Sequence, residues 1–556
     1  MSSQGSASSK RPLTNGSAAT NQSHMQVEKV GRDVVSCPNS SLSMRTVNVD
    51  HVEDVDARNM SMYTHVDNHF DGTHDLLTPE NTTLVQRHIP GNERPDILRN
   101  PRFWISQTLA VIVSSVILLA VVCVGLMHRS LGLIPRLIRL KGTPLRSWDC
   151  HGRWKGEKLV KSPQYYARSC GFDIADEQVE TKDGYYLRMH RVICNDTEQM
   201  RRGPGKGYPI LILHGLFQSS GSFITSEERS LAFWLAAQGY QVYLGNNRAA
   251  YDMGHRRFSR YAPEFWDYNI RDLALYDLPA MVDYVRQRTG YEKIAFIGHS
   301  QGNATAFIAL SRWFVPELGT KLSYFGALAP AVFAGPLTKC FPLSYMCKLD
   351  WPTWRRLFGV LDFIPLMKCM SWVSFQFRTI GRPLRHTRRL ATRCLVRKDV
   401  SNPAYLFEWN DTNWLSRRKP KMFRFTPQPV SSAAMFWWGG KDSFVTRGSL
   451  FEPDQQWFEE HFPPLALYGG GRDRLVLTQP LVEHIRKHEP NVRLLRVKIQ
   501  PEAEHCDHYW AADAVEWCFM DIVGTWTINH QMISKIHDVI GKTLSWSLYN
   551  DSPLPS

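Results

Sequence analysis

The clearest signal of the fold in this chain is KIAFIGHSQGNATAFIAL, from Lys293 to Leu310. It begins with an apolar run, Ile294 to Ile297, which is short and closed by Gly298, as is typical of a fully buried β-strand. Small residues follow Gly302 at a spacing that suits a helix. The stretch therefore predicts a strand, a tight turn and a helix in direct succession.

The turn itself, Gly298-His299-Ser300-Gln301-Gly302, has the Gly-x-Ser-x-Gly pattern of a nucleophile elbow. Such a turn holds a serine on a strained backbone, where side chains at the two glycine positions would collide with the strand and the helix. Ser300 would then project at the carboxyl edge of the sheet, with the N–H of Gln301 directed at a developing oxyanion. The alternative is an ordinary turn with a surface hydroxyl, so residues elsewhere must decide.

A folded core is predicted around this stretch, at residues 150–330 and 461–530. Two alternating strand patterns flank Asp183-Gly184, which is a strong hairpin signal. Beyond them, apolar strands alternate with helical patterns through the chain, which favours a mostly parallel sheet with helices on both faces. Residues 531–556 are expected to form a C-terminal tail.

A second oxyanion donor is predicted where the strand Ile210–Leu213 ends in His214-Gly215-Leu216. A backbone N–H in the loop after this strand faces the N–H of the elbow in enzymes that use such a turn. We expect Leu216 to supply it. His214 is expected to order the loop rather than to react.

The remaining members of a catalytic triad are predicted late in the chain. Asp473 follows a strand that ends in three glycines, where a carboxylate that orients the catalytic histidine is expected. His505 comes first in the loop after the last convincing strand, so it is preferred over His508 as the general base. Asp442 is the alternative carboxylate, but it is expected to be a turn residue.

The interval between the two parts of the core, residues 331–460, is far too long for a loop in a compact domain. It therefore predicts an inserted, mainly helical cap. Much of the chain's net charge of +14 lies in or near it, because sixteen Lys and Arg residues between Trp351 and Val430 stand against four Asp and Glu residues. Basic and aromatic residues together suit single-stranded nucleic acid, an apolar tunnel with a rim for anionic headgroups, or an ordinary solvated lid.

A transmembrane helix is predicted at residues 103–127, which carry no charge and exceed the ~20 residues needed to cross the hydrocarbon core. The polar residues 1–100 before it are expected to form a disordered tail, and their presence excludes an export signal. A buried core helix, or a hairpin from Phe103 to Leu140 that enters the membrane and returns, is the alternative. Residues 128–148 mix apolar and basic residues, as an interfacial amphipathic segment does.

No metal and no cofactor are expected. The eleven cysteines are scattered and never form a CxxC pair, so they indicate no zinc site. His505, Cys506 and His508 lie close together, but no further cluster accompanies them.

The motifs taken together resemble the acid lipase family of the α/β-hydrolases, the gastric and lysosomal lipases and their relatives, and look most like the fungal membrane-anchored steryl ester hydrolases. The likeness covers roughly residues 150 to 525 and is carried by VETKDGYYL at Val179, LHGLFQSSGSF at Leu213, YDLPAMVDYV at Tyr276, IGHSQG at Ile297, YGGGRDRLV at Tyr468 and EHCDHYW at Glu504.

This resemblance implies an α/β-hydrolase fold, with Ser300 as nucleophile, Asp473 and His505 as its partners, and the Leu216 and Gln301 amides as the oxyanion hole. It also implies hydrolysis of neutral lipid esters. A polar extension and a membrane span stand where secreted members have a signal peptide.

We therefore expect a single-pass membrane enzyme of the endoplasmic reticulum, lipid droplets or plasma membrane, acting on a steryl ester or triacylglycerol. An inactive membrane scaffold of the same fold is the alternative from another class. No recognition motif supports a nucleic-acid partner.

Overall fold

The computed structural model describes residues 101–137, 154, 157–194, 203–340, 343–365, 413–415 and 417–527, with side chains described only as far as residue 120 in the first range. All of them belong to one compact unit, His69–Ser556. The predicted tails at residues 1–100 and 531–556 lie outside the described residues. So do nine of the sixteen Lys and Arg residues between Trp351 and Val430, and the side chains of the predicted interfacial segment.

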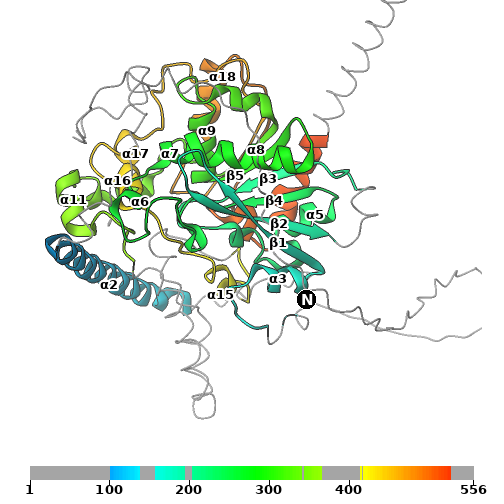
Figure 1. Cartoon of the computed structure of the whole chain (residues 1–556). Helices are drawn as coiled ribbons and strands as arrows, with labels where there is room; N and C mark the ends of the chain where they lie inside the picture. Colours follow the sequence, from blue (N-terminus) through cyan, green and yellow to red (C-terminus); the bar gives the residue numbers. More distant parts are fainter. Residues whose placement is uncertain are drawn as a thin grey trace, which may run out of the picture. The chain divides into compact units, whose positions relative to one another are not determined.

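An eight-stranded sheet forms the core, in the order β1-β2-β4-β3-β5-β6-β7-β8 (Figure 1). The strands from β4 to β8 are parallel, whereas β1 and β2 form an antiparallel hairpin at one edge. The predicted mostly parallel sheet is therefore confirmed. The strands are β1 (Phe172–Glu180), β2 (Tyr186–Cys194), β3 (Pro209–Leu213), β4 (Gln241–Gly245), β5 (Ile294–His299), β6 (Leu322–Leu328), β7 (Leu465–Gly470) and β8 (Leu494–Gln500).

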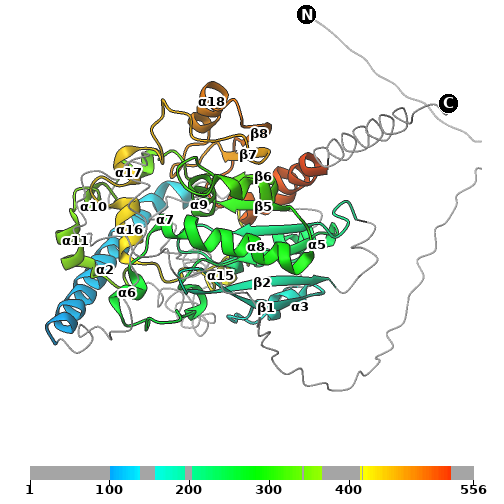
Figure 2. The ribbon, with the colours of Figure 1, turned by 45° about the horizontal axis from the view of Figure 1, so that its top comes forward.

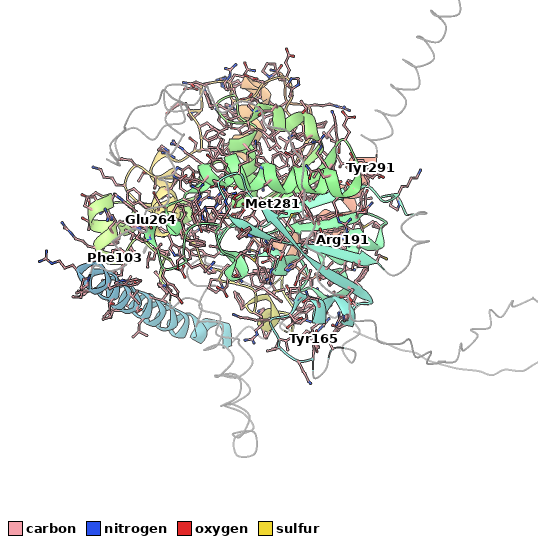
Figure 3. All side chains as sticks on the ribbon, in the orientation of Figure 1. Phe103, Tyr165, Arg191, Glu264, Met281 and Tyr291 are labelled. Carbon is pink, nitrogen blue, oxygen red and sulfur yellow. The ribbon has the colours of Figure 1, made fainter. Side chains whose placement is uncertain are left out.

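Helices cover both faces of the sheet because its central strands are apolar on both sides. Leu211 and Leu213 of β3 join one buried cluster with α8 and α9, whereas Ile210 and Ile212 join another with α5. Met281 of α8 lies in the first cluster (Figure 3). The helices of the core are α3 (Pro163–Ser169), α5 (Leu231–Ala237), α6 (Pro263–Trp266), α7 (Ile270–Asp272), α8 (Leu278–Thr289), α9 (Gln301–Ala309), α18 (Gln479–His488) and α19 (Asp507–Trp510).

The described residues between β6 and β7 hold short helices and turns. They are α10 (Leu343–Met346), α11 (Trp351–Phe358), α15 (Lys419–Met422), α16 (Ser432–Gly439) and α17 (Phe444–Arg447). That this interval is a separate cap with bounds at 331 and 460 stays a prediction.

Helix α2 (Pro101–Leu137) contains the predicted membrane span and runs without a break. Its first part, Pro101–Ala120, is long and apolar enough to cross a membrane, with a mean hydropathy of 2.0. The unbroken helix leaves no room within residues 101–137 for the turn of a hairpin. In both ribbon views α2 lies beside α11 (Figures 1 and 2), and the two helices are in contact.

Candidate active site

Ser300 sits on the sharp turn between β5 and α9, with φ at +51°. This left-handed backbone is strained for a residue other than glycine, and such strain is typical of functional sites. Both glycines of the motif are needed for close packing. A Cβ at Gly302 would lie 2.6 Å from the carbonyl oxygen of Leu213, and one at Gly298 would lie 2.3 Å from Oδ1 of Asn303.

A hydrogen-bonded line joins the three residues predicted as a triad. Nε2 of His505 lies 2.8 Å from Oγ of Ser300, and Nδ1 lies 2.8 Å from Oδ2 of Asp473. An ionised carboxylate only accepts hydrogen bonds, so Nδ1 carries the proton and Nε2 is free to accept the hydroxyl proton of Ser300. All three residues are buried. The arrangement can therefore activate Ser300 as a nucleophile.

Asp473 is fixed by the backbone around it. Its Oδ1 accepts hydrogen bonds from the N–H groups of Leu475 and Val476, at 2.9 and 3.1 Å. The loop after β7 packs closely on the loop after β8, since a Cβ at Gly470 would lie 2.4 Å from the carbonyl oxygen of Ala503. This close approach brings the carboxylate within reach of His505.

Within the described part of the chain, the side chains of the two alternative residues, Asp442 and His508, form no hydrogen bond with Ser300. Asp442 is exposed, with φ at +58° in a turn before α17, as expected for a turn residue. His508 is buried on α19, and its Nε2 has no hydrogen-bond partner among the described residues. Burial lowers the pKa of His508 to about 4, so its ring is neutral at neutral pH.

The predicted oxyanion donors lie on the two loops that meet at Ser300. Within the part of the chain that the structure describes, the N–H groups of Leu216 and Gln301 make no hydrogen bond. The loop after β3 touches the elbow, because a Cβ at Gly215 would lie 3.1 Å from Cβ of Ser300. Two free N–H groups beside a nucleophile are what a developing oxyanion requires.

His214 holds this loop in place. Its Nδ1–H donates to the carbonyl oxygen of Gly215 at 2.8 Å, and its Nε2 accepts from the N–H of Asn247 at 3.3 Å. Burial lowers the pKa of His214 to about 4, which keeps the neutral tautomer that these two bonds need. An ordering role, as predicted, fits this geometry.

A buried polar network that the sequence did not reveal links the oxyanion loop to His505. Gln218 accepts from the N–H of Gly215 at 3.1 Å and donates to the hydroxyl of Tyr509 at 2.7 Å. That hydroxyl lies 3.4 Å from Nδ1 of His299, whose Nε2 lies 3.0 Å from the carbonyl oxygen of His505. A carbonyl oxygen only accepts, so Nε2 of His299 carries the proton and Nδ1 accepts from Tyr509.

Burial holds the pKa of His299 well below its ordinary value of 6.5. His299 therefore stays neutral and keeps one donor and one acceptor, which is what the network requires. The residues of this network come from the loop after β3, the end of β5 and α19. Gln218, His299 and Tyr509 all lie in motifs that carry the family resemblance, but no local pattern showed that their side chains hydrogen-bond to one another.

A contact from α16 reaches the elbow. Nε1 of Trp438 donates to the side-chain oxygen of Gln301 at 2.9 Å. Next to it, the N–H of Gln428 donates to the carbonyl oxygen of Phe217, beside the predicted oxyanion donor Leu216. Residues between β6 and β7 thus touch both loops that carry the free N–H groups.

A serine on a strand–turn–helix elbow, hydrogen-bonded to histidine and aspartate in this chain order, defines a serine hydrolase of the α/β-hydrolase fold. Two family models match the chain, a partial alpha/beta-hydrolase lipase region at residues 163–227 and the alpha/beta hydrolase fold at residues 208–317.

Curated relatives match a longer stretch. Sterol esterase 2 of Saccharomyces cerevisiae is 31% identical over 402 residues, which are 65% of this chain and 70% of that protein. The human lysosomal acid lipase/cholesteryl ester hydrolase is 27% identical, over 66% of this chain and 92% of its own. Gastric triacylglycerol lipase of Mus musculus is 30% identical, over 64% and 88%.

The chain belongs to the acid lipase family of the α/β-hydrolases, and the predicted resemblance is confirmed. It is a carboxylic ester hydrolase of the lipase type.

Proposed function

We propose that this protein hydrolyses steryl esters at a membrane or lipid-droplet surface, with Ser300 as nucleophile, His505 as general base and acid, and Asp473 as the carboxylate that orients His505. The observation that carries the proposal is the line of two 2.8 Å hydrogen bonds from Asp473 through His505 to Ser300. The amides of Leu216 and Gln301 are proposed as the oxyanion hole.

The reaction follows from the positions of these groups. Oγ of Ser300 attacks the ester carbonyl while Nε2 of His505 takes the hydroxyl proton, and the carbonyl oxygen becomes an oxyanion that the two amides stabilise. When the ester bond breaks, His505 returns the proton to the departing sterol oxygen. Water then attacks the acyl-enzyme with His505 again as base, and a fatty acid leaves.

Asp473 stays ionised throughout this cycle and stabilises the imidazolium that forms twice. Its second oxygen is occupied by the two backbone N–H groups, so the carboxylate cannot rotate away from His505 without losing both bonds. The imidazole ring is therefore held with Nε2 towards Ser300.

The choice of a steryl ester rests on the similarity to Sterol esterase 2 and to the lysosomal cholesteryl ester hydrolases. The nearly equal similarity to a gastric triacylglycerol lipase supports triacylglycerol as a second candidate. The same triad serves both substrates, because each presents an ester carbonyl beside a long acyl chain. Side-by-side assays of cholesteryl oleate and triolein in one vesicle preparation decide between them.

The first experiment replaces the nucleophile. Ser300→Ala should abolish turnover of both esters and labelling by a fluorophosphonate probe, while Asn303 and the rest of α9 keep the fold, as a thermal melt would report. Full activity in the Ser300→Ala variant would end the proposal. Absence of probe labelling in the unmodified chain, with a normal melt, would instead favour an inactive membrane scaffold.

A further inference from the structure

Helix α2 presents one face to the protein. Between residues 101 and 120 its buried side chains are Gln107, Ala110, Ser114 and Leu118. They follow one another by three, four and four residues, so they form a single stripe along the helix. The stripe lies against α11 and the turn after it.

Gln107 identifies this stripe as a protein contact. Its Oε1 accepts a hydrogen bond from the N–H of Val360 at 3.3 Å. The contact is close, since a Cβ at Gly359 would lie 2.4 Å from Oε1 of Gln107, and φ of Gly359 is +73°. A polar side chain in an apolar helix is costly in lipid unless it has such a partner. Small residues at 110 and 114 allow the helices to approach closely.

Further contacts connect this stripe of α2 to the turn that carries Ser300. Leu118 belongs to one apolar cluster with Trp354, Phe363 and Phe436, and the oxyanion-loop residue Leu216 packs against the same cluster. A polar path runs in parallel. Oγ of Ser432 donates to the carbonyl oxygen of Gly359 at 2.8 Å, and Ser432 begins the helix whose Trp438 bonds Gln301.

The opposite face of α2 is apolar and exposed. Six of the eleven large hydrophobic side chains that are exposed among the described residues lie on this helix, and five of them form a stripe of their own. That stripe comprises Ile105, Leu109, Ile112, Val116 and Leu119, each between 56% and 62% exposed. A face of this kind on one helix marks a surface for lipid or for another protein.

The basic residues near this face favour a lipid surface as its partner and an orientation of the helix in the plane of that surface. Arg102 lies in the first turn of α2, and Arg355 and Arg356 are exposed on α11, which packs against α2. Phe103 marks the start of α2 beside α11 (Figure 3). If α2 crossed the bilayer here, α11 would carry two arginines into hydrocarbon, at a cost of several kcal/mol. If α2 lies in the plane of the interface, these arginines remain at the level of anionic headgroups.

We infer that Pro101–Ala120 of α2 is an interfacial helix that binds the bilayer through its exposed stripe and holds α11 and α16 over Ser300 through its buried stripe. The inference rests on the proposed function, since it concerns how a membrane ester reaches that site. It replaces the predicted crossing by an in-plane arrangement for this part of the helix. Lipid esters would then enter at the side of the molecule that faces the bilayer.

The protein-facing stripe is tested by disulfide cross-linking of the full chain in membranes. Gln107→Cys with Val360→Cys should form a cross-link under mild oxidation, and the cross-linked peptide is identified by mass spectrometry. Leu109→Cys with Val360→Cys is the matched control, because Leu109 lies on the exposed stripe, and it should not cross-link. Equal yields from the two pairs, or none from the first when both of its thiols are reactive, would overturn the inference.

The orientation is tested by the depth of spin labels in vesicles that contain anionic phospholipid. Labels on Ile105→Cys, Ile112→Cys and Leu119→Cys should lie at the same shallow depth, as expected for a helix in the interfacial plane. A crossing helix would place the label at 112 deepest and those at 105 and 119 near opposite surfaces. That depth profile would overturn the in-plane arrangement.

The link to turnover is tested with a second matched pair. Ala110→Trp overpacks the buried stripe and should lower the turnover of vesicle-borne ester about tenfold, whereas Thr108→Trp, at an exposed position outside both stripes, should leave it unchanged. Labelling of Ser300 by a small fluorophosphonate should persist in both variants, which separates this result from a failure of the proposed function. Equal turnover in the two variants, with the unmodified chain active, would refute the link while leaving the proposed function intact.

Discussion

Replacing Asp473 by asparagine should inactivate the enzyme because it changes the tautomer of His505. The hydrogen bonds of Asp473 show why. Oδ1 of Asp473 accepts two backbone N–H bonds, from Leu475 and Val476. In Asp473→Asn only the amide oxygen can accept them, so the NH₂ group must face His505. Nδ1 of His505 then becomes an acceptor and its proton moves to Nε2.

With the proton on Nε2, His505 can no longer accept the hydroxyl proton of Ser300, 2.8 Å away. The same substitution in other serine hydrolases lowers kcat by about 10⁴, which corresponds to about 5.5 kcal/mol in the transition state. We expect a loss of this size here because the two backbone bonds hold the amide in the wrong orientation. A freely rotating amide would lose less.

The assay is kcat for p-nitrophenyl butyrate in detergent micelles, together with the rate of fluorophosphonate labelling. Asp442→Asn is the matched control, since Asp442 is exposed in a turn whose positive φ asparagine tolerates, and its activity should not change. Thermal melts of both variants should resemble that of the unmodified chain. If Asp473→Asn kept more than about a tenth of the activity, the tautomer argument would be wrong.

Three further outcomes are expected. Gly302→Ala should destabilise the fold by about 1–3 kcal/mol in urea, because the new Cβ would lie 2.6 Å from a backbone oxygen; unchanged stability would contradict the packing of the elbow. Tyr509→Phe removes the donor to His299 and should lower kcat about tenfold with KM unchanged, whereas a change in KM alone would argue against a role in holding His505. Burial would raise the pKa of Glu227, but hydrogen bonds and charges from Arg417, Arg418 and Lys421 hold it at about 2, below the ordinary 4.5. The ionised carboxylate thus stabilises the fold fully above about pH 4.5 and loses this effect as the pH falls towards 2. The melting temperature of Glu227→Gln should therefore be lower than that of the unmodified chain at pH 7, and the two melting temperatures should converge in acid.

The sheet and the elbow could be predicted because their signals are local. The apolar run before Gly298 became β5, Ile294–His299, two residues longer than the run itself, and the hairpin turn at Gly184 adopts φ of +94° between β1 and β2. The strand predicted at Ile210–Leu213 begins one residue earlier, at Pro209. The residues of the proposed triad were named from the order of motifs along the chain, which the α/β-hydrolase fold converts into proximity.

The network around His299 could not be predicted, because its long-range hydrogen bonds join residues from 206 to 291 positions apart. Gln218 and Tyr509, for example, are 291 residues apart. The spacing of these two residues in the sequence does not predict a contact between them, and a buried glutamine or tyrosine hydroxyl can find many partners. The two faces of α2 were hidden for a different reason. The exposed stripe is entirely apolar, whereas the buried stripe includes Gln107 and Ser114, and the sequence alone did not show that these two face protein.

The residues proposed for catalysis and the residues expected to bind the substrate lie on different parts of the fold. Ser300, Asp473 and His505 follow β5, β7 and β8, so their spacing is set by the parallel strands of one sheet. The residues between β6 and β7 touch this site at Gln301 and beside Leu216, and α2 packs against α11 in that interval. Substitutions on α2 or α11 should therefore change the access and binding of a lipid ester. The rate of hydrolysis of a small soluble ester should stay unchanged in these variants.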